Sequence, residues 1–162
     1  MSHQQTQPAR IDPAQMATMR AAVVVSRYHG EITGPLAEAA AETFCEAGGL
    51  EANLTDLSVT GSWELIATCR ALANAATPPD CIVALGRVIT GEPTHDQFIN
   101  TAVSNALAQI IVETGVPIAF GVLTCQSMEQ AKARAGGSKG NKGAEAMVAA
   151  IEAAATIRSI RQ

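Results

Sequence analysis

The chain has 162 residues and a formal net charge of −4, and this length has room for one ordinary domain. Hydrophobic residues make up 48% and charged residues 16% of the sequence, a balance that excludes intrinsic disorder and gives no electrostatic attraction to nucleic acid or to an anionic membrane. No apolar run approaches the ~20 residues of a membrane span, and residues 1–10 lack the basic-then-apolar order of a secretory signal. We therefore expect a cytoplasmic protein.

The cysteines are scattered along the chain, at Cys45, Cys69, Cys81 and Cys125. They form no CxxC pair, and no group of acidic residues, His and Cys has the spacing of metal ligands. We therefore expect reduced, mostly buried thiols and no metal site.

The first segment in chain order, residues 1–20, is polar and Gln-rich and holds two prolines. This composition predicts a flexible tail ahead of a single domain over residues 21–162. Residues 21–26 (AAVVVS) then form an apolar, β-branched run, which is typical of a strand covered on both faces.

The next segment, residues 35–47, is predicted to be a helix. Thr33 is a candidate N-cap, Pro35 suits a first helical turn, and Gly48-Gly49 ends the pattern.

The rest of the chain repeats this alternation. Strands are predicted at residues 53–59, 81–89 and 117–124, and helices at residues 62–75, 97–114, 127–135 and 144–158. Strands and helices that alternate in this way predict a three-layer, doubly wound α/β sandwich with a four-stranded parallel sheet. The N-terminal tail could add an extra strand at the edge of this sheet.

Ligands of such sheets bind beyond the carboxyl ends of the strands. The segments that follow the first three strands are RYHG (27–30), TGSWE (60–64) and TGEPTHD (90–96). Two of the three histidines, the only Trp and the only Tyr fall in these segments, whereas the loops at the opposite edge carry no such groups. This asymmetry predicts a binding site at the carboxyl edge.

Each of these side chains has two interpretations. His95 is suited to proton transfer near neutral pH, or to capping the helix that follows it. Tyr28 and Trp63 are suited to stacking on a planar heterocycle, or to filling the core. Glu64 is suited to binding a ligand, or to a favourable interaction with a helix dipole.

A cationic, Gly-rich loop precedes the last helix. Arg134, Lys139 and Lys142 alternate with glycines there, a pattern that suits a phosphate or a solvated turn. The loop is not a P-loop, since GxxxxGK[ST] is absent.

Five stretches of the chain resemble, in order and spacing, the 6,7-dimethyl-8-ribityllumazine synthase family of riboflavin biosynthesis. They are SRYHGEITGPL (26–36), VTGSWEL (59–65), ALGRVITGEPTHDQF (84–98), ETGVPIAFGVLT (113–124) and RAGGSKGNKGAEA (134–146). The resemblance implies a flavodoxin-like fold and a transferase that uses no metal or organic cofactor. In its reaction, the amine of 5-amino-6-(D-ribitylamino)uracil attacks the ketone of 3,4-dihydroxy-2-butanone 4-phosphate, phosphate is eliminated, and ring closure with loss of water gives the lumazine.

The resemblance also implies a role for individual residues. By position, His95 would transfer protons and Arg134 would bind the phosphate of the butanone. The remaining implied contacts are Tyr28 stacked on the pyrimidine, Ser62, Trp63 and Glu64 on the ribityl side, Val88 and Ile89 lining the pyrimidine pocket through their backbone, and Phe120 and Lys142 supplied by a neighbouring subunit of a pentamer.

The sequence departs from the family pattern at a few of these positions. Pro93 precedes Thr94, the reverse of the usual order, so the phosphate contact would fall to Thr94 or to the amides of Gly91 and Glu92. His29 stands where Asn is common and would add a donor to the substrate. These departures keep open the alternative of a weakly active paralogue that binds a flavin or a lumazine.

Overall fold

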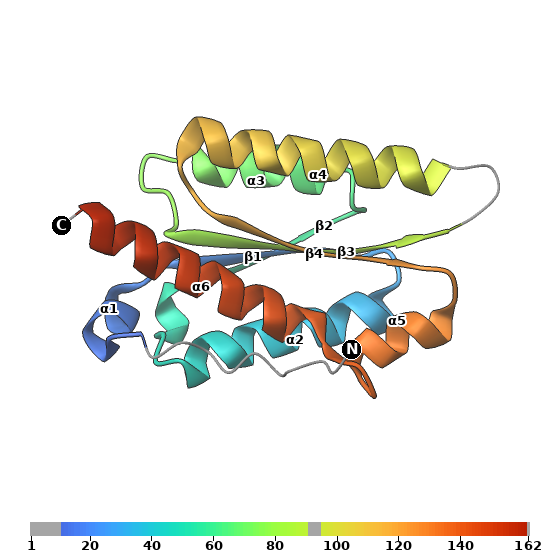
Figure 1. Cartoon of the computed structure of the whole chain (residues 1–162), viewed down its shortest axis with the longest axis horizontal. Coiled ribbons are helices and arrows are strands. Elements are labelled where there is room, and N and C mark those ends of the chain that lie inside the picture. The colour runs from blue at the N-terminus through green and yellow to red at the C-terminus, as the bar shows by residue number, and fades with distance from the viewer. Residues whose placement is uncertain (1–10, 91–94, 162) are drawn as a thin grey trace.

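A parallel sheet lies between two layers of helices (Figure 1) in the computed structural model, which describes residues 11–90 and 95–161. The strands are β1 (Ala21–Ser26), β2 (Leu54–Val59), β3 (Cys81–Ile89) and β4 (Ile118–Cys125), in the order β2-β1-β3-β4. All three strand pairs are parallel. The predicted four-stranded, doubly wound sandwich is therefore confirmed.

Helices cover both faces of this sheet (Figure 1). One face carries α1 (Pro13–Thr18), α2 (Gly30–Glu46), α5 (Met128–Arg134) and α6 (Lys142–Arg161), and the other carries α3 (Leu65–Ala73) and α4 (His95–Thr114). A short 3-10 helix, Glu51–Asn53, precedes β2. Among the described residues, no helix combines the length and the apolar character that a membrane span requires.

The burial of the strands follows their place in the sheet. The central strands β1 and β3 are almost wholly buried, which explains their continuous apolar sequences. All residues of the edge strand β2 are half-buried or exposed, which agrees with its more polar sequence. The side chains of β3 that alternate along the strand belong to two separate cores, one on each face of the sheet.

The start of α2 differs from the prediction. The helix begins at Gly30, so Thr33 is not its N-cap and Pro35 lies inside it. His29 occupies the N-cap position with a left-handed backbone (φ 60°) and gives no side-chain hydrogen bond to the helix. The sequence around Thr33 resembles a helix start, but the chain already turns into the helix at His29, shortly after the end of β1.

The flexible-tail prediction is wrong for the part of residues 1–20 that the structure describes. Asp12 caps α1 by accepting a hydrogen bond from the Ala14 amide at 2.9 Å, and Met16 and Met19 are fully buried against the sheet. Residues 11–20 add no edge strand, and residues 1–10 lie outside the described part of the chain.

Arg158 fastens the amino-terminal edge of the sheet. Its Nη2 donates to Asp80 Oδ2 at 2.7 Å and to the Thr18 carbonyl at 3.1 Å, and its Nε donates to Asp80 Oδ1 at 3.2 Å. Its Nη1 donates to the Gln15 carbonyl at 3.1 Å. The end of α6 is thereby tied to α1 and to the residue before β3.

The cationic loop folds into a hairpin that the sequence did not predict. Its strands are β5 (Ala135–Gly137) and β6 (Gly140–Asn141). Asn141 Oδ1 accepts from the Gly143 amide at 2.8 Å, and Asn141 Nδ2 donates to the Pro35 carbonyl at 3.0 Å. Any Cβ at Gly143 would lie 1.9 Å from the Leu36 carbonyl oxygen, so only glycine permits this contact between α2 and α6.

Candidate active site

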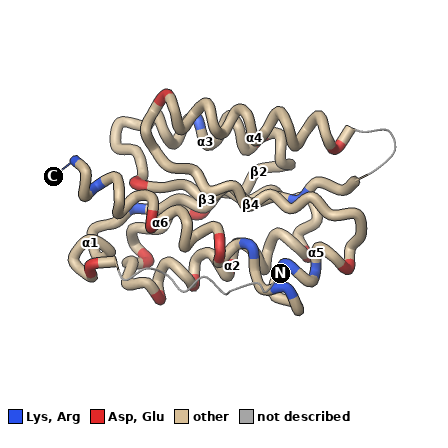
Figure 2. The backbone as a smooth tube through the Cα atoms, in the orientation of Figure 1, with Lys and Arg blue, Asp and Glu red and all other residues tan. Residues whose placement is uncertain are grey.

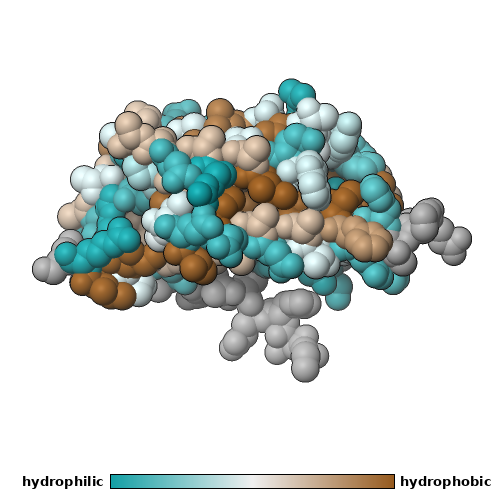
Figure 3. All heavy atoms as spheres, turned by 90° about the horizontal axis from the view of Figure 1, so that it is seen from above, coloured by the Kyte–Doolittle hydropathy of each residue, from teal (hydrophilic) through white to brown (hydrophobic). Residues whose placement is uncertain are grey.

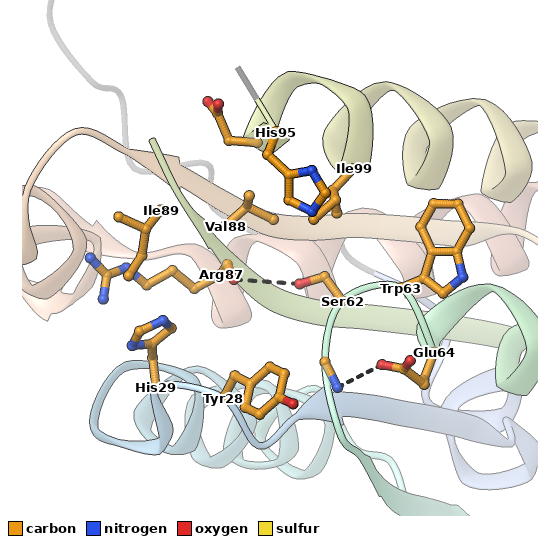
Figure 4. A pocket seen from close by; sticks show the side chains of 12 residues that line it. Tyr28, His29, Ser62, Trp63, Glu64, Arg87, Val88, Ile89, His95 and Ile99 are labelled. Carbon is orange, nitrogen blue, oxygen red and sulfur yellow. Dashed lines mark hydrogen bonds between the residues drawn. The ribbon is translucent and has the colours of Figure 1, made fainter. Parts of the chain in front are cut away.

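A pocket of about 710 Å³ opens at the carboxyl edge of the sheet (Figure 4). Its walls come from the segments that follow β1 and β2, from the carboxyl end of β3, and from the first turns of α4. The lining residues are Tyr28, His29, Gly61, Ser62, Trp63, Glu64, Arg87, Val88, Ile89, His95, Asp96 and Ile99. The predicted convergence of distant segments at this edge is therefore present in a single chain.

Backbone hydrogen bonds fix the segment after β1. The amide of Arg27 donates to the Val59 carbonyl at 2.8 Å, and the amide of Tyr28 donates to the Thr60 carbonyl at 3.2 Å, which extends the β1–β2 pairing into the loops. The Tyr28 side chain is 61% exposed, so it does not fill the core. A Cβ at Gly61 would lie 2.9 Å from its ring, so glycine makes room for the phenol beside the loop.

The segment after β2 positions a carboxylate and a hydroxyl in the pocket. Glu64 Oε2 accepts from the Gly61 amide at 2.9 Å, which holds the carboxylate back over its own turn. Ser62 Oγ donates to the Arg87 carbonyl at 3.5 Å. Trp63 is 56% exposed and lies beside Glu64 in Figure 4, so its indole is available to a ligand.

The carboxyl end of β3 and the start of α4 complete the described part of the pocket. Val88 and Ile89 lie on its floor, and His95, the first residue of α4, points over them (Figure 4). Three of the predicted contacts, Gly91, Glu92 and Thr94, fall within residues 91–94, outside the described residues. The structure thus brings together His95 with the predicted contacts from the first two loops.

The predicted phosphate-binding side chains lie elsewhere in the chain. Arg134, Lys139 and Lys142 line a separate pocket of about 480 Å³ beside the carboxyl end of β4. Figure 2 shows Lys and Arg gathered around α5 and the start of α6. Phe120 lines neither pocket, and its side chain is 41% exposed on the edge strand β4.

The sequence of the chain matches the family model described as 6,7-dimethyl-8-ribityllumazine synthase over residues 18–158. The chain belongs to this family. Proteins of that name share 43% identity with it in Rhodopirellula baltica, over 82% of this chain and 85% of the relative, and 43% in Streptomyces coelicolor, over 89% and 88%. A third, from Edwardsiella ictaluri, is 41% identical over 88% of this chain and 91% of its own length. The resemblance inferred from the five sequence stretches is therefore confirmed.

The pocket of this lumazine synthase family member also contains side chains that the sequence analysis missed. Arg87 was hidden in the apolar run CIVALGRVI, where we predicted only a strand, and a charge inside a buried strand was the available signal. Asp96 fell in the predicted segment TGEPTHD and Ile99 in the predicted helix that follows it, both without a role, and α4 directs both to the pocket.

The cysteines lie away from the pocket around His95. Cys69, Cys81 and Cys125 are buried, as predicted for most of the cysteines, Cys45 is exposed, and all four are free thiols. Burial raises the pKa of both the Cys69 and the Cys81 thiols to about 12. These two thiols are therefore protonated at neutral pH and have no nucleophilic role there.

Proposed function

We propose that the pocket around His95 is where this chain condenses 5-amino-6-(D-ribitylamino)uracil with 3,4-dihydroxy-2-butanone 4-phosphate, the reaction of the lumazine synthase family. The observation that carries the proposal is the meeting of three carboxyl-end segments in one pocket, in a chain that belongs to this family. The reaction forms one C–N bond as an imine with loss of water. Elimination then releases phosphate, and a second C–N bond closes the ring with loss of another water.

His95 is the proposed proton-transfer residue. Its imidazole points over the pocket floor, where it can accept a proton from the attacking amine and return it to a leaving oxygen (Figure 4). An imidazole takes up a proton as the neutral base and returns it as the imidazolium, so one side chain can serve both transfers. We expect a moderate contribution to the rate, since the uncatalysed condensation is itself appreciable.

The ends of the pocket suit the parts of the uracil substrate. The exposed Tyr28 ring offers a stacking surface for the pyrimidine, and Val88 and Ile89 offer backbone groups along its edge. Glu64 uses Oε2 for the Gly61 amide, so Oε1 is the oxygen we assign to the ribityl hydroxyls, beside Ser62 and Trp63. These assignments follow the family resemblance and the position of each side chain in the pocket.

We propose that Arg134 and Lys142 serve the pocket of a neighbouring subunit. Both line a different pocket of their own chain, which supports an assembly in which Arg134 and Phe120 of one copy face His95 of the next. Exposed apolar side chains support self-association, since Phe98 and Val112 of α4 are 72% and 82% exposed. Figure 3 views the molecule from the side of α3 and α4 and shows hydrophobic atoms on its surface. We propose a homo-oligomer built from pentamers, and a cytoplasmic location stays a prediction.

An assay with both purified substrates, following lumazine absorbance and fluorescence, tests the function. We expect turnover above the spontaneous rate, a collapse in Arg134→Ala and a smaller fall in His95→Ala. Binding of a flavin without turnover above the spontaneous rate would instead favour a paralogue with a binding role.

A mixing experiment tests the shared site. Chains carrying His95→Ala are unfolded and refolded together with chains carrying Arg134→Ala, so that mixed oligomers form. If the two residues meet across subunits, some interfaces regain both, and the mixture is more active than the average of the two variants. A mixture whose activity equals that average would contradict a site shared between subunits.

A further inference from the structure

One charged side chain in the pocket has almost no partner in the protein. Arg87 is 5% exposed, yet among the described residues its guanidinium makes one hydrogen bond, from Nη1 to Met128 Sδ at 3.5 Å. Its Nε is buried without any hydrogen-bond partner, and no described carboxylate forms an ion pair with it. A thioether sulfur is a weak acceptor, so the buried positive charge is not compensated within the chain.

The surroundings of the guanidinium suit an anion. Figure 4 shows the Arg87 side chain directed toward His29 and Ile89, at the end of the pocket opposite Trp63 and Glu64. His29 immediately precedes α2, a helix of 17 residues that receives no side-chain cap from it. The positive end of this helix dipole and the guanidinium therefore favour negative charge at the same end of the pocket.

There is also room for a ligand at this end. Arg87, His29 and Ile89 all line the pocket of about 710 Å³. Arg87 is the one Lys or Arg among the described residues that line this pocket. A cation fixed by a strand is suited to binding, because its position does not depend on the ordering of a surface loop.

We propose that Arg87 binds the phosphate group of the butanone substrate, and later the phosphate ion released from it, within the same chain that supplies His95. Arg134, from the neighbouring subunit, would then be a second cation on this group. The proposal rests on the proposed site around His95. It explains why a guanidinium is kept buried without a carboxylate partner, since the substrate provides the missing anion.

Steady-state kinetics of Arg87→Gln, with each substrate varied in turn, test this proposal. We expect the KM for the butanone phosphate to rise about 10- to 100-fold, as for loss of a charge-assisted hydrogen bond, and the KM for the uracil substrate to change less than about twofold. Inhibition by inorganic phosphate should weaken in parallel. Arg27→Gln is the matched control, because Arg27 lies exposed at the same edge and donates to Thr60 Oγ1 at 3.2 Å.

Thermal unfolding of Arg87→Met gives an independent measurement. If the guanidinium is kept for the substrate, its apolar replacement leaves the Tm of the ligand-free protein unchanged or raises it. A Tm several degrees lower would make Arg87 a structural residue and overturn the proposal. So would an equal rise of both KM values in Arg87→Gln, or phosphate inhibition that stays unchanged. If one of these contrary results is found while the unaltered protein still turns over both substrates, the proposal for Arg87 fails and the proposed reaction stands.

Discussion

Two arginines at opposite edges of one sheet differ in what their guanidinium groups contact. Arg158, at the amino-terminal edge, donates to both carboxylate oxygens of Asp80 and to two backbone carbonyls. Arg87, at the carboxyl edge, donates only to a methionine sulfur among the residues that the structure describes, although it is the more buried of the two. The comparison teaches that hydrogen bonding, rather than burial, separates an arginine that stabilises the fold from one that is available to a ligand.

The largest expected effect is a loss of stability when Arg158 is replaced. Replacing Arg158 by Met removes its hydrogen bonds to Asp80 and to two carbonyls, so we expect the free energy of unfolding to fall by about 2–4 kcal/mol. Chemical denaturation measures this loss. Arg70→Met is the control, because the pair of Arg70 with Glu113 is exposed to solvent and should contribute little to stability. Equal losses in the two variants would contradict the special role of the amino-terminal edge.

A smaller effect is expected at the carboxyl edge, where side chains are exposed instead of paired. Tyr28→Ala should weaken binding of the uracil substrate by about 1–2 kcal/mol, because the stacking surface is lost. The unfolding midpoint of this variant should scarcely change, since Tyr28 is 61% exposed. Titration calorimetry with the uracil substrate gives the affinity, and Tyr28→Phe, which keeps the ring, should bind as the unaltered chain does. Unchanged affinity in Tyr28→Ala would contradict a stacking role and leave the ring with a packing role only.

The smallest signal concerns a thiol at the amino-terminal edge. Cys81 follows Asp80, and its pKa of about 12 keeps it protonated at pH 8, so we expect iodoacetamide to modify the exposed Cys45 and to leave Cys81 unmodified. Alkylation should increase only as the pH rises toward that pKa or as the protein unfolds. Mass spectrometry of the peptides gives both rates. Faster modification of Cys81 in Arg158→Met would show that this edge opens locally when its hydrogen bonds are removed.

Much of the fold could be predicted because its strands are simple in sequence. β3 begins and ends where the apolar run of residues 81–89 begins and ends. The helix α1 was missed although Asp12 and Pro13 form a regular helix start, because a short helix is stabilised mainly by what it packs on. The burial of Met16 and Met19 depends on α6 and the sheet, and no local pattern reports such contacts.

The site could be predicted in part for a similar reason. Parallel strands bring their carboxyl ends to one edge, so Tyr28, Trp63 and His95 were correctly expected to line one cavity. Sequence order does not tell which copy of a chain supplies a residue, and Arg134 lies in a different pocket of its own chain. Arg87 was missed because its interest lies in the partners that it lacks, and these are visible only in three dimensions.

Trp63 has a practical consequence for all of these experiments. It is the only tryptophan of the chain and lies half-exposed at the pocket, so the intrinsic emission of the unlabelled protein originates where substrates bind. Quenching or a spectral shift on adding the butanone phosphate, the uracil or inorganic phosphate would report occupancy one component at a time, before any chemistry occurs. Binding and turnover can thus be separated without introducing a dye.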